Sequence, residues 1–191
     1  MTAFRVALVG VLVLLAGVAG ACVLVLRGGG TPDLPPMAVE TIAANPDIAL
    51  PQRLDVESTA EGCRGYSVRI PTARVMGTPG SNARALMLDA NDSALLLTCM
   101  NTTSTTGDLE SFVAEKIAHP TGSIRTLPTA TEVHSPYGRA IRTESVVGAK
   151  TLTEWFTERD GMTWGVGYLH PADDASQQPT VEAVLASWSW S

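Results

Sequence analysis

Three histidines are the first candidates for chemistry in this 191-residue chain, and their spacing argues against a metal site. His119, His134 and His170 lie far apart in the sequence. No two of them share the H-x-x-x-H spacing that places two ligands on one helix face. We therefore expect each to be a satisfied or solvent-facing side chain, and we expect neither a metal nor a cofactor.

Acidic pairs offer no better route to catalysis. Glu154 and Glu158 fall in one predicted strand, where a rise of about 3.3 Å per residue separates them by roughly 13 Å. Glycoside hydrolysis needs two carboxyl groups about 5–10 Å apart, so we predict that both acids are solvated instead. Residues 89–93 resemble a calcium loop, but they lack its central glycine, and Met100 stands where a glutamate ligand is needed. The sequence predicts no catalytic residue.

Two cysteines predict a disulfide. Cys63 and Cys99 are the only thiols outside the apolar run at the start of the chain, and they form no C-x-x-C redox motif. One disulfide suits an oxidising compartment. The alternative is a pair of buried, unpaired thiols.

Aromatic residues concentrate in the second half of the chain. Core packing is the first expectation for them, because a small domain needs large apolar side chains to fill its interior. A binding role is the alternative, in which partly exposed rings line a groove for a partner, an acyl chain or a sugar. The candidates for such a surface are Trp155, Trp164, Tyr168 and Trp190.

The strongest positional signal is an uninterrupted apolar run of 21 residues, Val6–Leu26, between Arg5 and Arg27. As a helix it would span about 30 Å, which matches the hydrocarbon core of a bilayer. A cleaved signal peptide would have a shorter apolar core. A lipoprotein would carry its lipid on Cys22, which follows only a loose lipobox. We expect an uncleaved single-pass anchor in the cell membrane, with a lipoprotein and a secreted protein as alternatives.

The charge of the chain after the apolar run limits the class of partner, and its cysteines indicate the compartment. All 19 acidic residues lie beyond position 30, against 11 basic residues beyond Arg27, which leaves a net charge of −8 on this part. Such a charge argues against nucleic acid as a partner. A disulfide would place the C-terminal domain on the extracytoplasmic side.

Composition divides the chain into three parts. Residues 1–27 form the anchor or signal segment. Residues 28–61 are interrupted by glycines and prolines, and we predict a stalk with one short helix over Ala38–Ala44. An extended segment that packs on the domain is the alternative. Residues 62–191 are long enough for one folded domain with its own core.

Periodicity within the domain predicts an α+β fold, an antiparallel β-sheet flanked by helices and preceded by the single transmembrane helix. Asp108 is a predicted helix cap, and Asp160-Gly161 is a strong two-residue hairpin signal. The expected strands cover 66–71, 85–89, 93–100, 131–135, 138–147, 151–159 and 162–169, and the expected helices cover 109–119 and 180–188.

The element order resembles the PsbP/LpqN type of domain, found in small actinobacterial envelope proteins of the LpqN group. The resemblance covers roughly residues 62–190. It rests on the strand Tyr66–Pro71, the Asp160-Gly161 hairpin and the last helix running into Ser187-Trp188-Ser189-Trp190. The usual aromatic residue after the first strand's proline is missing, since Thr72 follows Pro71, and no family site residue can be carried over. The resemblance implies an α/β/α sandwich used for binding or assembly more often than for catalysis.

These observations favour a membrane-anchored, extracytoplasmic and non-catalytic binding domain of the bacterial cell envelope. Its partners would be the lipid bilayer, through Val6–Leu26, and an envelope protein or ligand that the sequence does not name. A carrier or sensor for a small apolar ligand is the first alternative, and it would need a cavity between the sheet and the last helix. An enzyme of unrecognised type is the second.

Overall fold

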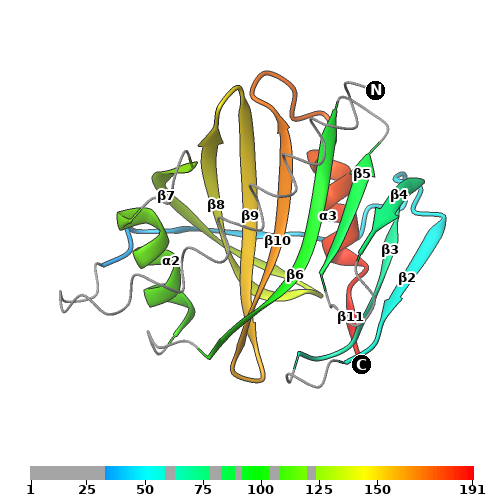
Figure 1. Cartoon of the computed structure of the whole chain (residues 1–191), viewed down its shortest axis with the longest axis horizontal. Helices are drawn as coiled ribbons and strands as arrows, with labels where there is room; N and C mark the ends of the chain where they lie inside the picture. The colour runs from blue at the N-terminus through cyan, green and yellow to red at the C-terminus, as the bar shows by residue number, and fades with distance from the viewer. Residues whose placement is uncertain (1–32, 59–62, 78–82, 89–91, 104–107, 120–123) are drawn as a thin grey trace.

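The computed structural model describes residues 33–58, 63–77, 83–88, 92–103, 108–119 and 124–191 (Figure 1). The predicted anchor and Cys22 lie outside these residues. No helix in the described part is long and apolar enough to cross a membrane. The elements in chain order are β1 (Ala38–Thr41), β2 (Gln52–Val56), β3 (Tyr66–Ile70), β4 (Ala73–Met76), β5 (Arg84–Leu88), β6 (Ser93–Thr103), α2 (Leu109–Ala118), β7 (Ile124–Ser135), β8 (Gly138–Val147), β9 (Lys150–Arg159), β10 (Met162–Pro171), α3 (Gln178–Ala186) and β11 (Ser189–Trp190).

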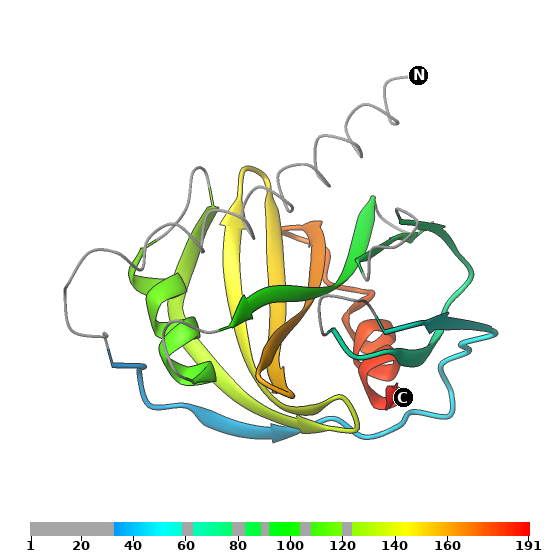
Figure 2. The same cartoon turned by 60° about the horizontal axis from the view of Figure 1, so that its bottom comes forward.

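The strands form two sheets. The large sheet has eight strands in the order β1-β7-β8-β9-β10-β6-β5-β4, and the small sheet has the order β11-β3-β2. Every paired strand runs antiparallel except β1, which runs parallel to β7 at the outer edge (Figure 2). The predicted α+β class is confirmed, but the large sheet is mixed and not purely antiparallel.

Local sequence signals explain the hairpin between β9 and β10 and the start of α2. Asp160 and Gly161 both have positive φ, 53° and 74°, as a type I′ turn requires. The Asp108 side chain accepts a hydrogen bond of 2.7 Å from the Ser111 backbone N–H, which caps α2. Both signals were read correctly from the sequence.

The two helices cover opposite faces of the large sheet. Neighbouring residues of a strand point to opposite faces, and on β9 Trp155 belongs to the core beneath α3, whereas Phe156 packs with α2. The main core lies between the large sheet on one side and α3 with β3 on the other. In Figure 1, α3 lies beside β11 and the small sheet, behind the large one.

The described part of the predicted stalk is built into the domain. The expected helix over Ala38–Ala44 is wrong, because this segment contains the edge strand β1, and β2 pairs along its whole length with β3. Ile42 and Val56 are buried in the main core. Of the two alternatives, the extended segment that packs on the domain matches residues 33–58. The alternation of Leu54 and Val56 with polar neighbours is the strand signal that the surrounding prolines obscured.

The last helix ends earlier than its apolar period suggested. We predicted a helix to Trp188, but α3 stops at Ala186, and Trp188 leads into β11. The helix ends here because the following residues bind β3 instead. Ser189 and Trp190 pair with Ser67 and Tyr66 of that strand.

A disulfide joins Cys63 to Cys99, with a Cα–Cα distance of 6.1 Å. Cys63 precedes β3 in the small sheet, and Cys99 lies in β6 of the large sheet. The bond therefore ties the two sheets together at one corner. It also supports an extracytoplasmic location for the domain.

We predict that replacing both Cys63 and Cys99 with alanine lowers the free energy of unfolding by about 3–4 kcal/mol, because the unfolded chain regains the entropy of a loop of 36 residues. Urea denaturation of the folded chain measures this loss. Peptide mapping under non-reducing conditions should recover the two cysteines in one linked pair of peptides. Recovery of both as free, alkylated cysteines would contradict the bond.

Candidate functional site

Three of the four aromatic residues that were candidates for a binding surface lie in the interior. Trp155, Trp164 and Tyr168 are each at most 1% exposed, and Trp190 is half-buried. Trp155, Trp164 and Tyr168 therefore follow the core-packing expectation, whereas Trp190 keeps part of its surface exposed. The reason is that β9 and β10 are central strands, covered by α2 on one face and by α3 on the other.

Five rings form one aromatic cluster where the two sheets and α3 meet: Tyr66, Tyr137, Trp164, Trp188 and Trp190. Trp188 stacks on Tyr66 with 4.4 Å between ring centroids, and Trp190 lies 5.0 Å from Trp164. The Trp190 indole N–H donates a hydrogen bond of 3.0 Å to the Tyr137 carbonyl oxygen. Trp188, Tyr66 and Tyr137 are at most 4% exposed, so the cluster is a structural core and leaves little surface for a ligand.

Two tyrosine hydroxyls in this cluster are buried away from water. Neither the Tyr66 nor the Tyr137 hydroxyl has a hydrogen-bond partner among the described residues. Burial raises the pKa of Tyr66 above its usual value of 10.0, although the charge of Arg84 opposes the shift. Burial also raises the pKa of Tyr137 well above 10.0, with a smaller contribution from Tyr66. Both phenols stay protonated throughout the physiological range.

These raised pKa values predict loss of stability in alkali. Above about pH 10 the unfolded chain releases the protons of Tyr66 and Tyr137, whereas the folded protein retains them. The free energy of unfolding should therefore be independent of these groups below pH 10 and should fall as the pH rises further. Absorbance at 295 nm should show the two phenolates forming only together with unfolding. Their reversible ionisation near pH 10 in the folded protein would contradict this account.

A buried ion pair connects α2 to the large sheet. The Lys116 Nζ lies 3.0 Å from the Glu154 Oε2, and the two side chains are only 18% and 7% exposed. Lys116 Nζ also lies 5.4 Å from the centre of the Phe156 ring. The expectation that Glu154 is solvated is wrong, because α2 covers its face of β9. Glu158, four residues further along the strand, is exposed as predicted.

Replacing one member of this ion pair should lower the free energy of unfolding more than replacing both members. We expect Glu154→Leu alone to destabilise the fold by about 3 kcal/mol, because Lys116 is left with an unpaired charge. The double variant Lys116→Met with Glu154→Leu should recover most of that loss. Urea denaturation of the two single variants and the double variant measures the coupling. Additive losses would show that the pair does not interact.

The histidines lie apart, as their spacing indicated. His134 Nε2 lies 2.7 Å from Glu132, and His119 lies 3.2 Å from Glu115. His170 is buried, stacks on Tyr168 and has its Nδ1 2.7 Å from the Pro171 carbonyl oxygen. Among the described residues, no group of three His, Cys, Asp or Glu side chains is placed to hold a metal ion.

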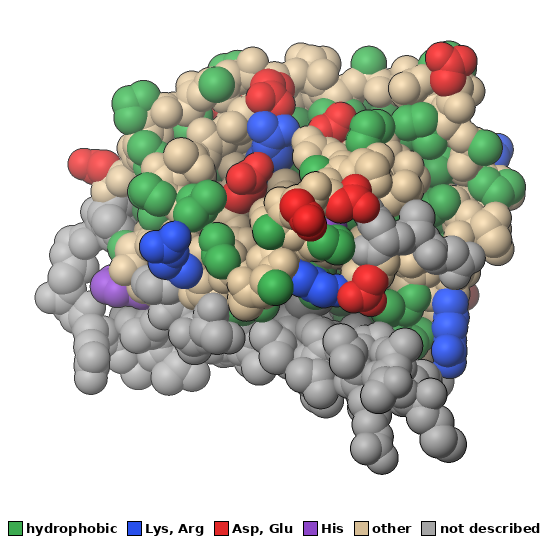
Figure 3. Space-filling model, turned by 90° about the horizontal axis from the view of Figure 1, so that it is seen from above, with side chains coloured by type: hydrophobic (Ala, Val, Ile, Leu, Met, Phe, Trp, Pro, Cys, Tyr) green, Lys and Arg blue, Asp and Glu red, His purple; other side chains and the backbone are tan. Residues whose placement is uncertain are grey.

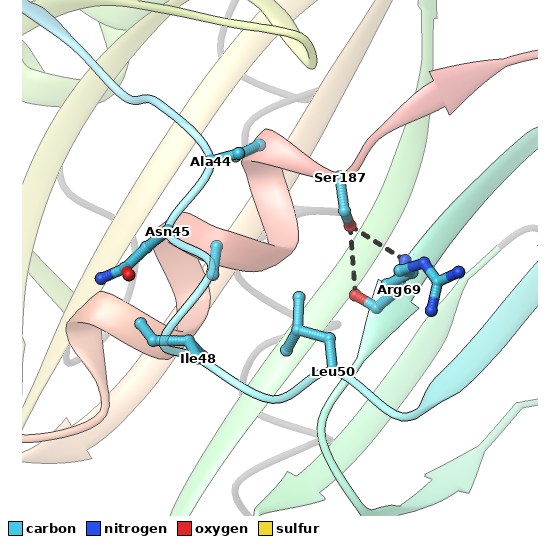
Figure 4. Close-up of a pocket in the computed structure, with 8 residues that line it drawn as sticks. Ala44, Asn45, Ile48, Leu50, Arg69 and Ser187 are labelled. Carbon is cyan, nitrogen blue, oxygen red and sulfur yellow. Dashed lines mark hydrogen bonds between the residues drawn. The ribbon is translucent and has the colours of Figure 1, made fainter.

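An open groove of about 260 Å³ lies between α3, β3 and the segment that joins β1 to β2 (Figure 4). It opens to solvent on the side of α3 away from the large sheet. The lining is mainly apolar, with polar groups at the rim. The residues that line it are Ala44, Asn45, Ile48, Leu50, Arg69, Ala183, Ala186 and Ser187.

A turn shapes the outer rim of the groove. Asn45-Pro46-Asp47-Ile48 has the residues that a type I turn favours, asparagine first and proline second. The Asn45 side chain accepts a hydrogen bond of 3.1 Å from the Asp47 backbone N–H, and the Ile48 N–H donates to the Asn45 carbonyl oxygen. This turn directs Ile48 and Leu50 back toward α3, where both are half-buried.

A side-chain clamp fixes the inner wall. Ser187 Oγ accepts a hydrogen bond of 2.9 Å from the Arg69 backbone N–H, and it lies 2.8 Å from the Val184 carbonyl oxygen at the end of α3. The hydroxyl continues the β11–β3 ladder by one more contact and joins the helix to the strand. In Figure 4 the Arg69 side chain extends away from α3.

Arg69 contributes its backbone to the groove, and its charged side chain lies beside the groove on the outer face of the small sheet. Its guanidinium is exposed and forms no ion pair within the described part of the chain. Arg53 lies directly opposite on β2, so the two side chains share the outer face of the small sheet. Arg53 is already neutralised by Asp55, with Nε contacts of 2.9 and 3.1 Å.

Sequence reasoning missed this groove. The Asn-Pro-Asp turn is visible in the sequence, but it falls within the predicted stalk. Arg69 looked like any outward-facing residue of a strand. The juxtaposition of the 42–51 segment with α3 depends on contacts more than 130 residues apart in the chain, which no local pattern contains.

The chain matches no protein-family model and no curated protein sequence.

Proposed function

We propose that this chain is a non-catalytic binding domain of the bacterial cell envelope, held in the membrane by Val6–Leu26, and that the groove beside α3 is its binding site for an envelope protein. The observation that carries the proposal is the groove itself. It combines a mainly apolar lining with an arginine that has no ion-pair partner in the described part of the chain, and its walls are fixed by the Asn45 turn and the Ser187 clamp.

The shape of the groove favours a protein partner over a small apolar ligand. Carriers enclose most of the ligand surface in cavities of about 300–1,000 Å³. The groove is slightly smaller and open to solvent, and it lies outside the core between the sheet and α3. A groove of this kind suits one or two side chains that project from a larger partner.

The remaining surface fits the same proposal. On the face shown in Figure 3, the described acidic and basic side chains lie interspersed with apolar and uncharged ones, and no basic patch is visible among them. This pattern and the net charge favour a protein partner over nucleic acid. Helices on opposite faces of the sheet support a PsbP/LpqN-like α/β/α sandwich, a type of domain used mostly for binding or assembly.

Site-specific photocrosslinking in the native membrane tests this proposal. A photoreactive amino acid at Ile48, inside the groove, should give one discrete adduct with a membrane or envelope protein. The matched control is Val146, an aliphatic residue on β8 that is 37% exposed and lies outside the groove. A chain without adducts at Ile48, or with the same adducts at both positions, would contradict a binding role for the groove.

A further inference from the structure

We infer that the partner segment bound in the groove is acidic, with a carboxylate that pairs with Arg69 and an aliphatic side chain that packs beside α3. This inference rests on the proposed function and names the chemistry of the partner.

The register of β2 and β3 places two arginines side by side. Arg53 and Arg69 are directly opposed, and like charges in opposed positions of an antiparallel pair destabilise each other. Asp55, two residues along β2, neutralises Arg53 but makes no contact with Arg69. Arg69 therefore has no ion-pair partner among the described residues, and a carboxylate of the partner would supply one.

The chemistry of arginine narrows the choice of anion. A guanidinium presents parallel N–H donors that match the two oxygens of a carboxylate. The side chain is exposed and has no ion-pair partner among the residues that the structure describes, so a partner can reach it. The Arg69 backbone N–H donates a hydrogen bond of 2.9 Å to Ser187 Oγ, whose own hydrogen points to the Val184 carbonyl oxygen at 2.8 Å, so the Arg69 backbone is linked to the end of α3.

The apolar lining specifies the neighbour of the carboxylate. Leu50 and Ile48 form one wall, and α3 contributes the small side chains of Ala183, which is buried, and Ala186, which is half-buried. An aliphatic side chain of leucine size fits between these walls and gains stability by leaving water. The partner motif is therefore an extended segment in which an aspartate or glutamate adjoins an aliphatic residue.

Two blocked peptides test this chemistry on the full chain in detergent micelles: acetyl-Ala-Leu-Asp-Ala-amide and its Asn counterpart. In two-dimensional NMR of the 15N-labelled chain, the Asp peptide should shift the amides of Leu50, Arg69 and Ser187 in a saturable way. The Asn peptide should bind about tenfold more weakly, because it cannot form the charged pair. Added salt should weaken only the Asp peptide.

Variants at Arg69 make the test specific. Arg69→Gln should reduce binding of the Asp peptide to the level of the Asn peptide, and Arg69→Lys should retain part of the difference. The matched control is Arg125→Gln, which removes an exposed arginine from β7 of the large sheet. Equal binding of the two peptides, no saturable shift at the groove, or undiminished binding to the Arg69→Gln variant would overturn the inference. If crosslinking from Ile48 succeeds while these peptides fail, the groove is a binding site for a partner of different chemistry.

Discussion

The stacking of Trp188 on Tyr66 is the contact on which the rest of this structure depends. It brings the residues after α3 against β3. These residues, Trp188–Ser191, form a short tail that adds a strand to the small sheet and fills the centre of the aromatic cluster. Further contacts hold the same corner. The Arg64 side chain donates a hydrogen bond of 2.8 Å to the Ser191 carbonyl oxygen and pairs with Asp160, and the Ser191 N–H donates to the Gly65 carbonyl oxygen. Gly65 permits this close approach, because a Cβ there would lie 2.9 Å from the Val56 carbonyl oxygen.

The groove depends on these contacts between the tail and β3. The tail helps the Ser187 clamp and the main core to hold α3 against β3 at the inner wall, and the pairing of β2 with β3 carries the preceding turn to the outer wall. A binding site built in this way draws on three distant parts of the chain. It can keep a fixed shape although each wall is short, because the disulfide and the aromatic cluster anchor the strands beneath it.

Short sequence patterns predicted those parts of the fold that depend on interactions between neighbouring residues. Short-range interactions determine the turn at Asp160-Gly161, the helix cap at Asp108 and the alternation in β8, β9 and β10. The predicted strands and the predicted start of the helix therefore agree with the structure. Residues 33–58 were misread because prolines indicate interruption but do not say whether the interrupted chain packs on a sheet. The burial of Glu154 was also invisible, because the sequence does not state which face α2 covers. The groove could not be predicted for the same reason, since Arg69 and Asn45 become neighbours of α3 only through tertiary contacts.

Hydrogen exchange on a chain that ends at Ser187 tests the central claim that the tail holds the small sheet and the groove in place. We predict that amides of β2 and β3 lose their protection, while those of β8, β9 and β10 keep most of theirs, because loss of two tryptophans from the corner removes several kcal/mol of packing there. Unchanged protection in β2 and β3 would contradict the account, since the small sheet would then be stable without the Trp188 contact.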